Sequence, residues 1–193
     1  MTSTSDAFNQ QGYAALRQAL ADPLLGFLWR YVIERAANGS LQTNDPDVPA
    51  AACAYADPIM EHLLERLRPR VEEVTGLSLY PTYSYLRVYR TGDRLVPHVD
   101  RPACEISVSV NLGQEPAEPW PLWVRGPLGP YAAALEGGDA LVYRGVDCEH
   151  WREPYEGARL AQVFLHYVHQ TGPHASWKFD KRAGLALTSV LPL

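Results

Sequence analysis

The chain has 193 residues, of which 47% are apolar and 20% charged, and its formal net charge is −5. A chain of this length can bury one substantial core, so we expect a single domain over residues 1–193. The acidic balance disfavours nucleic acid as a partner, because it offers no basic surface to a phosphate backbone.

The N-terminal residues show no signal for secretion or membrane insertion. Residues 1–11 are polar and lack the basic and apolar tract of a secretory signal, and the most apolar stretch, 23–33, is interrupted by Arg30. We therefore expect a cytoplasmic protein without a membrane partner. The sequence leaves the oligomeric state open.

Two helices are predicted in the first third of the chain. Asp22-Pro23 begins an apolar pattern of helical spacing that runs to Asn38-Gly39, and Asp57-Pro58 begins a second one that ends at Gly76. Pro69 is expected to kink the second helix. Residues 39–51 between them form a polar loop whose role the sequence leaves open, and residues 6–76 as a whole are predicted to be a helical support.

From residue 77 onward, β-branched and aromatic residues alternate with turn signals, which is typical of antiparallel strands. The predicted strands are Leu79–Tyr89, Glu105–Leu112, Leu122–Arg125, Ala140–Tyr143 and Arg159–His169. We expect an α+β, mainly β protein: a double-stranded β-helix (jelly roll, cupin-like) over residues 77–170, backed by the N-terminal helices. Residues 171–193 are predicted to form a C-terminal arm, to which the sequence assigns no chemical role.

The three cysteines are predicted to be structural. Cys53, Cys104 and Cys148 are odd in number and have no short paired spacing, so they indicate neither a disulfide framework nor a thiolate zinc site.

His98 and Asp100 are the candidate metal ligands, together with His150. Residues i and i+2 of an extended segment face the same side, so a His-x-Asp triplet can converge on one ion. Two imidazoles and one carboxylate on one face of an iron ion leave the opposite face open, as in non-heme Fe(II) oxygenases. Taken alone, such a triplet also occurs by chance in surface loops.

The surrounding pattern resembles the 2-oxoglutarate- and Fe(II)-dependent dioxygenases, in particular their prolyl-hydroxylase-like and phytanoyl-type branches. A strand ending at Tyr89 leads through a Gly-containing turn to His98-Val99-Asp100, and Gly138–Gly145 later leads into His150. The resemblance covers roughly residues 63–168, and the combination of motifs in this order is what makes it specific.

The resemblance implies a set of cofactors and a mechanism. Fe(II) would be held by His98, Asp100 and His150, with 2-oxoglutarate and O2 as co-substrates and ascorbate as a reductant that maintains Fe(II). No side chain beyond the three ligands would be catalytic. Succinate and CO2 would be released as a C–H bond of the substrate is hydroxylated. Asp100 favours hydroxylation, since related halogenases have Gly or Ala at this position.

The family also needs a cation for the far carboxylate of 2-oxoglutarate, about ten positions after the distal histidine. Arg159 lies nine positions after His150 and is the predicted residue, while Arg152 is the weaker candidate. Tyr89 occupies the position of a tyrosine whose hydroxyl contacts the co-substrate in this family, although it is equally compatible with a core aromatic.

Strand alternation extends these predictions to the substrate. If Tyr89 faces the pocket, then Tyr85 and Arg87 share its face, while Leu86 and Val88 face the helices. A buried arginine needs an anionic partner, so Arg87 and Tyr85 are the candidate substrate-binding residues; a surface strand with Arg87 in water is the alternative.

The substrate and two other function classes remain open. Leu95 stands where prolyl hydroxylases commonly have a tyrosine, so the substrate is either a small molecule (amino-acid-like or an acid) or a peptide side chain. The same ligands on a cupin-like barrel also suit a metal-dependent hydrolase or isomerase, in which Arg159 and Tyr89 would lack a common purpose. A non-catalytic jelly-roll binding protein is the other alternative.

Overall fold

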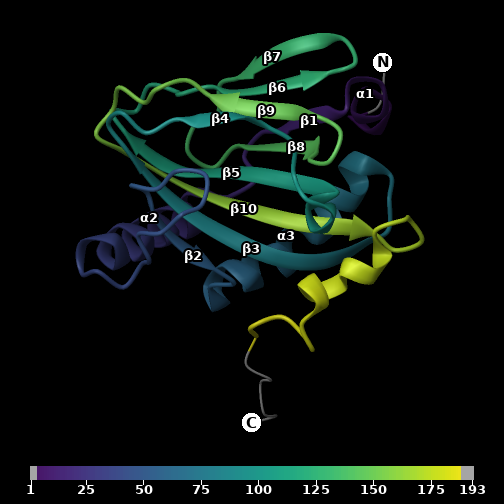
Figure 1. Cartoon of the computed structure of the whole chain (residues 1–193), viewed down its shortest axis with the longest axis horizontal. Helices are drawn as coiled ribbons and strands as arrows, with labels where there is room; N and C mark the ends of the chain where they lie inside the picture. The colour runs from purple at the N-terminus through teal and green to yellow at the C-terminus, as the bar shows by residue number, and fades with distance from the viewer. Residues whose placement is uncertain (1–3, 188–193) are drawn as a thin grey trace.

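The computed structural model describes residues 4–187, in which two antiparallel sheets face each other (Figure 1). The larger sheet has six strands in the order β1-β8-β5-β10-β3-β2, and the smaller has four in the order β4-β9-β6-β7. In chain order, the strands are β1 (Tyr13–Leu16), β2 (Ala52–Tyr55), β3 (Leu79–Arg90), β4 (Leu95–His98), β5 (Ile106–Glu115), β6 (Leu122–Gly126), β7 (Gly129–Ala133), β8 (Ala140–Arg144), β9 (Glu149–Arg152) and β10 (Arg159–His169). This is the predicted jelly roll.

Helices cover the outer face of the larger sheet, whereas the smaller sheet lies on the opposite side (Figure 1). The covering helices are α2 (Asp22–Ala37) and α3 (Pro58–Thr75), whereas α1 (Thr4–Gln11) packs against α3 and β1. The Asp57 carboxylate accepts a hydrogen bond from the Met60 amide and caps α3, and Gly76 ends it in the left-handed conformation. Pro69 does not interrupt the helix as expected, because α3 continues through it.

The main core lies between the helices and the larger sheet. On the sheet side it includes Leu86 and Val88 of β3 and Val163 and Leu165 of β10, which pack with α3 residues such as Leu64. The alternate residues of both strands therefore point into the space between the two sheets. This alternation decides which side chains can reach a site inside the barrel.

The prediction of a purely helical support over residues 6–76 is wrong in one respect. It contains β1 and β2, which pair with β8 and β3 and form the two edges of the larger sheet. The five predicted strands are confirmed, with ends that differ by a few residues. The five missed strands, β1, β2, β4, β7 and β9, have only four or five residues each, too few to show a periodic pattern.

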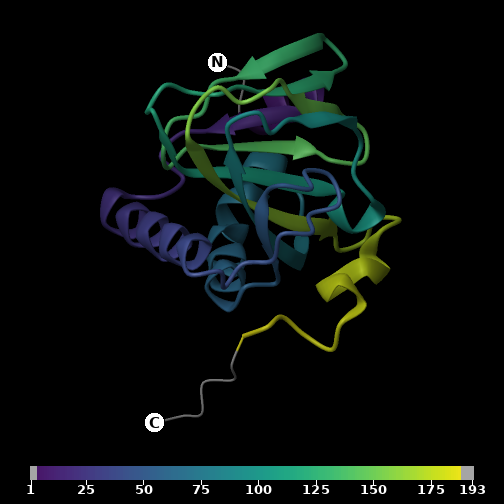
Figure 2. The same ribbon diagram turned by 60° about the vertical axis from the view of Figure 1, so that its left-hand side comes forward.

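Two segments outside the jelly roll lie against it. The loop between α2 and β2 is joined to β2 by a bridge between Gln42 and Cys53, and comes forward across the strands in Figure 2 (blue). The C-terminal arm contains a short 3-10 segment, Ala175–Lys181, which contacts β3 and β10.

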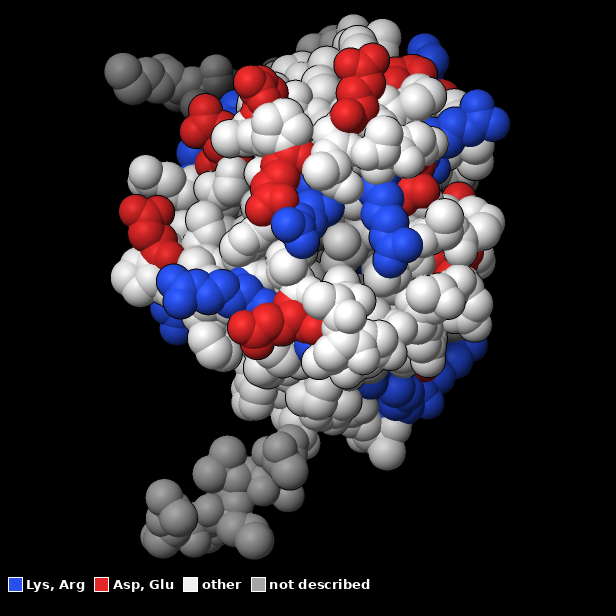
Figure 3. All heavy atoms as spheres, turned by 90° about the vertical axis from the view of Figure 1, so that its left-hand side faces the viewer, with Lys and Arg blue, Asp and Glu red and all other residues white. Residues whose placement is uncertain are grey.

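The described residues contain no helix that is both long and apolar enough to cross a membrane. On the face shown in Figure 3, acidic and basic side chains are interspersed among uncharged ones, without a continuous basic area.

Candidate metal centre

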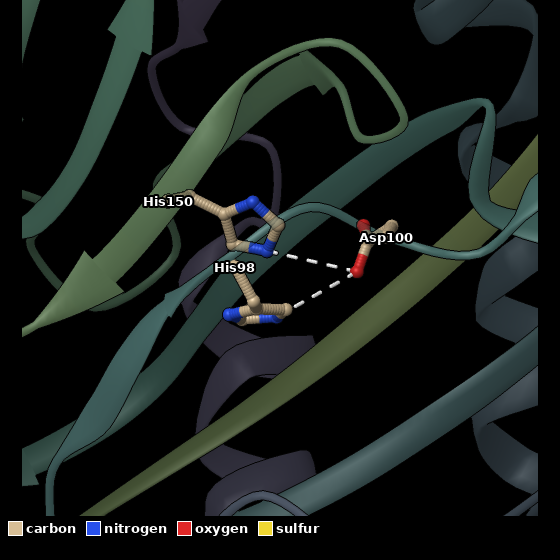
Figure 4. A group of neighbouring side chains, drawn as sticks. All are labelled: His98, Asp100 and His150. Atoms are coloured by element: carbon tan, nitrogen blue, oxygen red, sulfur yellow. Dashed lines mark ion pairs between the residues drawn. The ribbon is translucent and has the colours of Figure 1, made fainter.

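His98, Asp100 and His150 meet between the two sheets. His98 is the last residue of β4 and is the cross-strand partner of His150 on β9, while Asp100 lies two residues beyond β4. Their ligand atoms all lie within 4.8 Å of one another. In Figure 4 the three side chains point toward one another, with Asp100 opposite the two rings.

The distances suit a shared ion. Oδ1 of Asp100 lies 3.8 Å from Nε2 of His98 and 3.6 Å from Nε2 of His150. These separations exceed hydrogen-bonding distance and leave space for an ion, which binds nitrogen and oxygen ligands at roughly 2.0–2.2 Å. The three side chains supply one face of a coordination sphere.

Backbone carbonyls orient both rings. Nδ1 of His98 lies 2.9 Å from the carbonyl oxygen of Val96, and Nδ1 of His150 lies 3.0 Å from that of Cys148. Because a carbonyl oxygen only accepts, each Nδ1 carries the proton and each Nε2 keeps its lone pair for a metal. Burial also lowers the pKa of His150, which favours the neutral ring that a metal needs.

Asp100 is held in place by two contacts. Its amide donates to the carbonyl of Gly145 (2.8 Å), and its Oδ2 accepts from the Ser107 hydroxyl (2.8 Å). A Cβ at Gly145 would collide with Oδ2 of Asp100 and with the carbonyl oxygen of Cys104. A side chain at position 145 would therefore displace the carboxylate.

A buried histidine fixes the Ser107 hydroxyl in turn. Nδ1 of His166 lies 2.9 Å from the Ser107 oxygen. Since the hydroxyl proton is donated to Asp100, Nδ1 of His166 must be the donor in this contact. Burial lowers the pKa of His166 to about 4, so the ring is neutral near pH 7 and serves as a hydrogen-bond donor without charge.

The three candidate ligands line a cavity of about 370 Å³. Tyr83, Tyr85 and Phe164 line it from the larger sheet, Tyr55 on β2 is exposed, and Asp47 of the loop also lines it. This volume is in the range of small-molecule sites.

The prediction that Arg159 faces the pocket is wrong. Arg159 lies on the same side of β10 as Ala161 and Val163, which belong to the core under the helices. Its side chain is 45% exposed, and its Nε donates to Glu115 (2.6 Å) at the rim of the sheet. The spacing from His150 was as expected, but Arg159 lies on the helix-facing side of β10 and not on the side that faces the cavity.

Arg152, the weaker sequence candidate, is the buried cation instead. It follows His150 by two residues on β9, and its cross-strand partner Leu95 lines the cavity. Its guanidinium donates to Gln162 Oε1 (2.7 Å) and to the carbonyl of Trp120, while its Nε has no partner among the described residues. Burial lowers the pKa of Arg152 to about 10, because no carboxylate compensates its charge.

More unused hydrogen-bonding capacity lies beside Arg152. The Trp120 indole, whose ring centre is 4.5 Å from the guanidinium carbon, has a buried Nε1 without a partner in the described residues. Tyr89 packs edge-on against Trp120 and is fully buried, and its hydroxyl accepts from Arg87 (3.1 Å). Such unsatisfied buried donors are rare in native proteins and indicate a missing acceptor.

Arg87 and Tyr85 line the cavity together, on the side of β3 that the alternation predicted. Arg87 is buried, so the alternative of a surface arginine is excluded. Its partner, however, belongs to the chain: Asp45 accepts from its Nε (2.6 Å) and Nη2 (2.8 Å), and also from the Tyr85 hydroxyl (3.0 Å). This pairing could not be predicted from the sequence, because the two residues are 42 positions apart.

The other candidates are less suited to hold a metal. Cys104 and His166 form a second possible group with Asp100, but burial strongly raises the pKa of the Cys104 thiol, which disfavours the thiolate ligand. All three cysteines are buried and free, as the sequence predicted. His62 is exposed on α3, which covers the outer face of the larger sheet, so it does not face the space between the two sheets.

No protein-family model and no curated protein matches the chain. Solved structures do match it. A Pseudomonas putida prolyl-4-hydroxylase superposes with a TM-score of 0.69 at 16% identity, over 86% of this chain and 97% of that one. EctD from S. alaskensis, solved with 2-oxoglutarate and 5-hydroxyectoine, gives 0.71 at 17% identity over 95% and 86%.

A third similar structure is HygX from Streptomyces hygroscopicus with nickel and 2-oxoglutarate bound, with a TM-score of 0.66 at 13% identity over 86% and 85% of the two chains. At these identities the likeness establishes only the fold, which the chain shares with a prolyl-4-hydroxylase and with proteins solved with 2-oxoglutarate bound. The chemistry must be argued from the site.

Proposed function

We propose that the protein is an Fe(II)- and 2-oxoglutarate-dependent dioxygenase that hydroxylates a C–H bond of a small molecule or a peptide side chain. The observation that carries the proposal is the pairing of two features inside one barrel. His98, Asp100 and His150 present three ligand atoms to one point, and Arg152 is a buried cation without an anion.

The donor set favours iron over most other metals. Two neutral imidazoles and one carboxylate on a single face are the ligands of non-heme Fe(II) oxygenases, and they leave positions for a bidentate co-substrate and O2. When bound, the metal would bring O2 and 2-oxoglutarate together, so that O2 oxidises both 2-oxoglutarate, to succinate and CO2, and the C–H bond of the substrate, which becomes C–OH. Ascorbate would maintain the metal as Fe(II).

Arg152 is the proposed partner of the far carboxylate of 2-oxoglutarate, in place of Arg159. A dicarboxylate would provide the negative charge that is missing beside Arg152. It would also provide hydrogen-bond acceptors for Nε of Arg152 and Nε1 of Trp120. The Tyr89 hydroxyl has its proton free for the same group, since it accepts from Arg87. The two alternative functions, a metal-dependent hydrolase or isomerase and a non-catalytic binding protein, do not require a buried cation at Arg152.

The roles of the chain's other residues follow from their contacts. The Val96 and Cys148 carbonyls orient the two rings, and Ser107 turns Asp100 so that Oδ1 faces the metal position. Because Arg152 is buried, a carboxylate bound to it would be shielded from water.

Anaerobic addition of Fe(II) and 2-oxoglutarate tests the proposal. We expect the weak visible absorption band of the iron–2-oxoglutarate chelate, and we expect it to be lost in His98→Ala but kept in His62→Ala, whose side chain is exposed on α3. A folded, iron-loaded protein without this band would exclude the oxygenase function.

A further inference from the structure

Two segments outside the jelly roll are fastened at the mouth of the cavity by arginine–carboxylate pairs. Asp45 of the 39–51 loop binds Arg87 through two hydrogen bonds. Asp180 of the C-terminal arm binds Arg101 in the same way, at 2.7 and 2.8 Å, and also accepts from the Tyr55 hydroxyl (2.7 Å). Paired contacts of this kind fix geometry as well as charge.

In these pairs, carboxylates of the chain neutralise the arginines that line the cavity. Arg87 has Nε and Nη2 on Asp45 and Nη1 on Tyr89, and both terminal nitrogens of Arg101 are on Asp180. Among the described residues that line the cavity, no arginine or lysine is left without a carboxylate. An anionic substrate would therefore find no free cation at this mouth.

One carboxylate at the mouth is in excess. Asp47 makes a single contact with Arg87 (3.0 Å to Nη2), although Asp45 already neutralises that guanidinium. Its side chain is 46% exposed and lines the cavity. Two carboxylates therefore share one guanidinium, so Asp45, Asp47 and Arg87 together carry a net charge of −1, and Asp47 is the exposed carboxylate of the two.

The remaining walls of the cavity are aromatic or apolar. Tyr83, Tyr85 and Phe164 line it from the larger sheet, and Val99, which follows His98, is 53% exposed beside it. The faces of Tyr85 and Phe164 already have the Arg87 guanidinium above them, which disfavours a second cation on those rings. These surfaces suit an uncharged carbon skeleton.

We propose that the substrate is a small amine, whose protonated nitrogen binds Asp47 while its uncharged carbon skeleton lies against the aromatic wall facing the metal centre. This inference rests on the proposed function, because it takes the cavity at His98, Asp100 and His150 as the active site. It replaces the expectation of an anionic substrate group on Arg87, whose charge Asp45 neutralises.

The test compares three ring compounds of similar size: cyclohexylamine, cyclohexanol and cyclohexanecarboxylate. Their binding to the full chain loaded with Zn(II) and 2-oxoglutarate is measured by ligand-observed NMR, which needs no turnover. We expect the amine to bind about tenfold or more tightly than the carboxylate, as a charge-assisted hydrogen bond at a partly exposed site provides.

Substitutions assign the preference to Asp47. Asp47→Asn should remove it, Asp47→Glu should restore at least part of it, and Glu73→Gln, which changes the same charge on the exposed side of α3, should leave it unchanged. Equal or tighter binding of the carboxylate by the native protein would overturn the proposal. So would an amine preference that survives in folded Asp47→Asn.

This outcome can be separated from that of the proposed function. An amine preference in a protein that forms no iron–2-oxoglutarate band would support amine recognition and refute the oxygenase. A clear band without amine preference would refute only the substrate class.

Discussion

Replacing Arg152 by methionine is predicted to stabilise the co-substrate-free protein while it abolishes the response to 2-oxoglutarate. Methionine keeps much of the length of the arginine stem and removes the buried charge. Most substitutions of buried residues lower stability, so an increase would be a specific sign that the native residue serves a ligand.

The magnitude follows from the pKa of Arg152. Its fall to about 10 corresponds to about 3 kcal/mol that burial costs the charged side chain. The penalty is complete below pH 10, where the folded and unfolded chains both hold the proton, so it applies fully at pH 7.5. Loss of the hydrogen bonds to Gln162 and Trp120 offsets about 1–2 kcal/mol, which leaves a net gain of about 1–2 kcal/mol.

Urea unfolding at pH 7.5, with Mn(II) and with or without 2-oxoglutarate, measures both effects. At 100 times its dissociation constant, 2-oxoglutarate should stabilise the native protein by about 2.7 kcal/mol, and this increment should vanish in Arg152→Met. Arg159→Met is the matched control: its exposed pair with Glu115 contributes at most about 1 kcal/mol, and its 2-oxoglutarate response should be native.

The opposite pattern would refute this reasoning. If Arg159→Met lost the 2-oxoglutarate response while folded Arg152→Met kept it, the spacing from His150 would be the better guide and the buried cation would have another role. A substantial loss of stability in Arg152→Met would show that its partners compensate the charge more completely than the structure indicates.

Three further predictions concern the support of Asp100. Ser107→Ala should weaken Fe(II) binding by roughly 10- to 100-fold in a metal titration, since it removes the donor to Oδ2, whereas Ser84→Ala, whose buried hydroxyl has no partner among the described residues, should not. Gly145→Ala should cost about 1–3 kcal/mol in urea unfolding and impair metal binding at least as strongly, because its Cβ collides with the carboxylate; native affinity would contradict this. Because His166 has a pKa of about 4 when folded and about 6.5 when unfolded, the metal-free protein should lose stability as the pH falls from 6.5 toward 4, by about 2–3 kcal/mol at pH 4.5. His166→Asn, which keeps a donor for Ser107, should lose correspondingly less, and an unchanged pH dependence would exclude His166 as the cause.

The sequence predicted the long elements and the proximity of His98 and Asp100 because both are encoded locally. Helix α3 has a capping aspartate and a terminal glycine, and the parity of β3 puts Arg87 on the same face as Tyr85 and Tyr89, although the sequence left open whether that face is buried. His98 and Asp100 are neighbours on one extended segment. The four-residue strands could not be predicted, because their conformation depends on pairing with distant strands such as β3 and β8.

The error at Arg159 has a specific physical origin. In β10 both faces are buried, one under the helices and one inside the barrel, so Leu160–Leu165 is apolar on both sides apart from Gln162. Alternation of hydrophobicity therefore could not tell which face was the inner one. The polar residues Gln162 and His166 were the signal, since they share the parity opposite to Arg159.

Charge compensation then separates the arginines of the barrel by role. Arg87 and Arg101 each bind a carboxylate of the chain through two hydrogen bonds, so they fasten the loop and the C-terminal arm and have little left for a ligand. Arg152 is buried without a carboxylate, whereas Asp47 shares the Arg87 guanidinium with Asp45, which leaves that group with a net negative charge. A dianionic co-substrate at Arg152 and a protonated amine at Asp47 would neutralise the net charge of both sites. The net charge of each site therefore indicates what the pocket binds better than the spacing of the residues along the chain does.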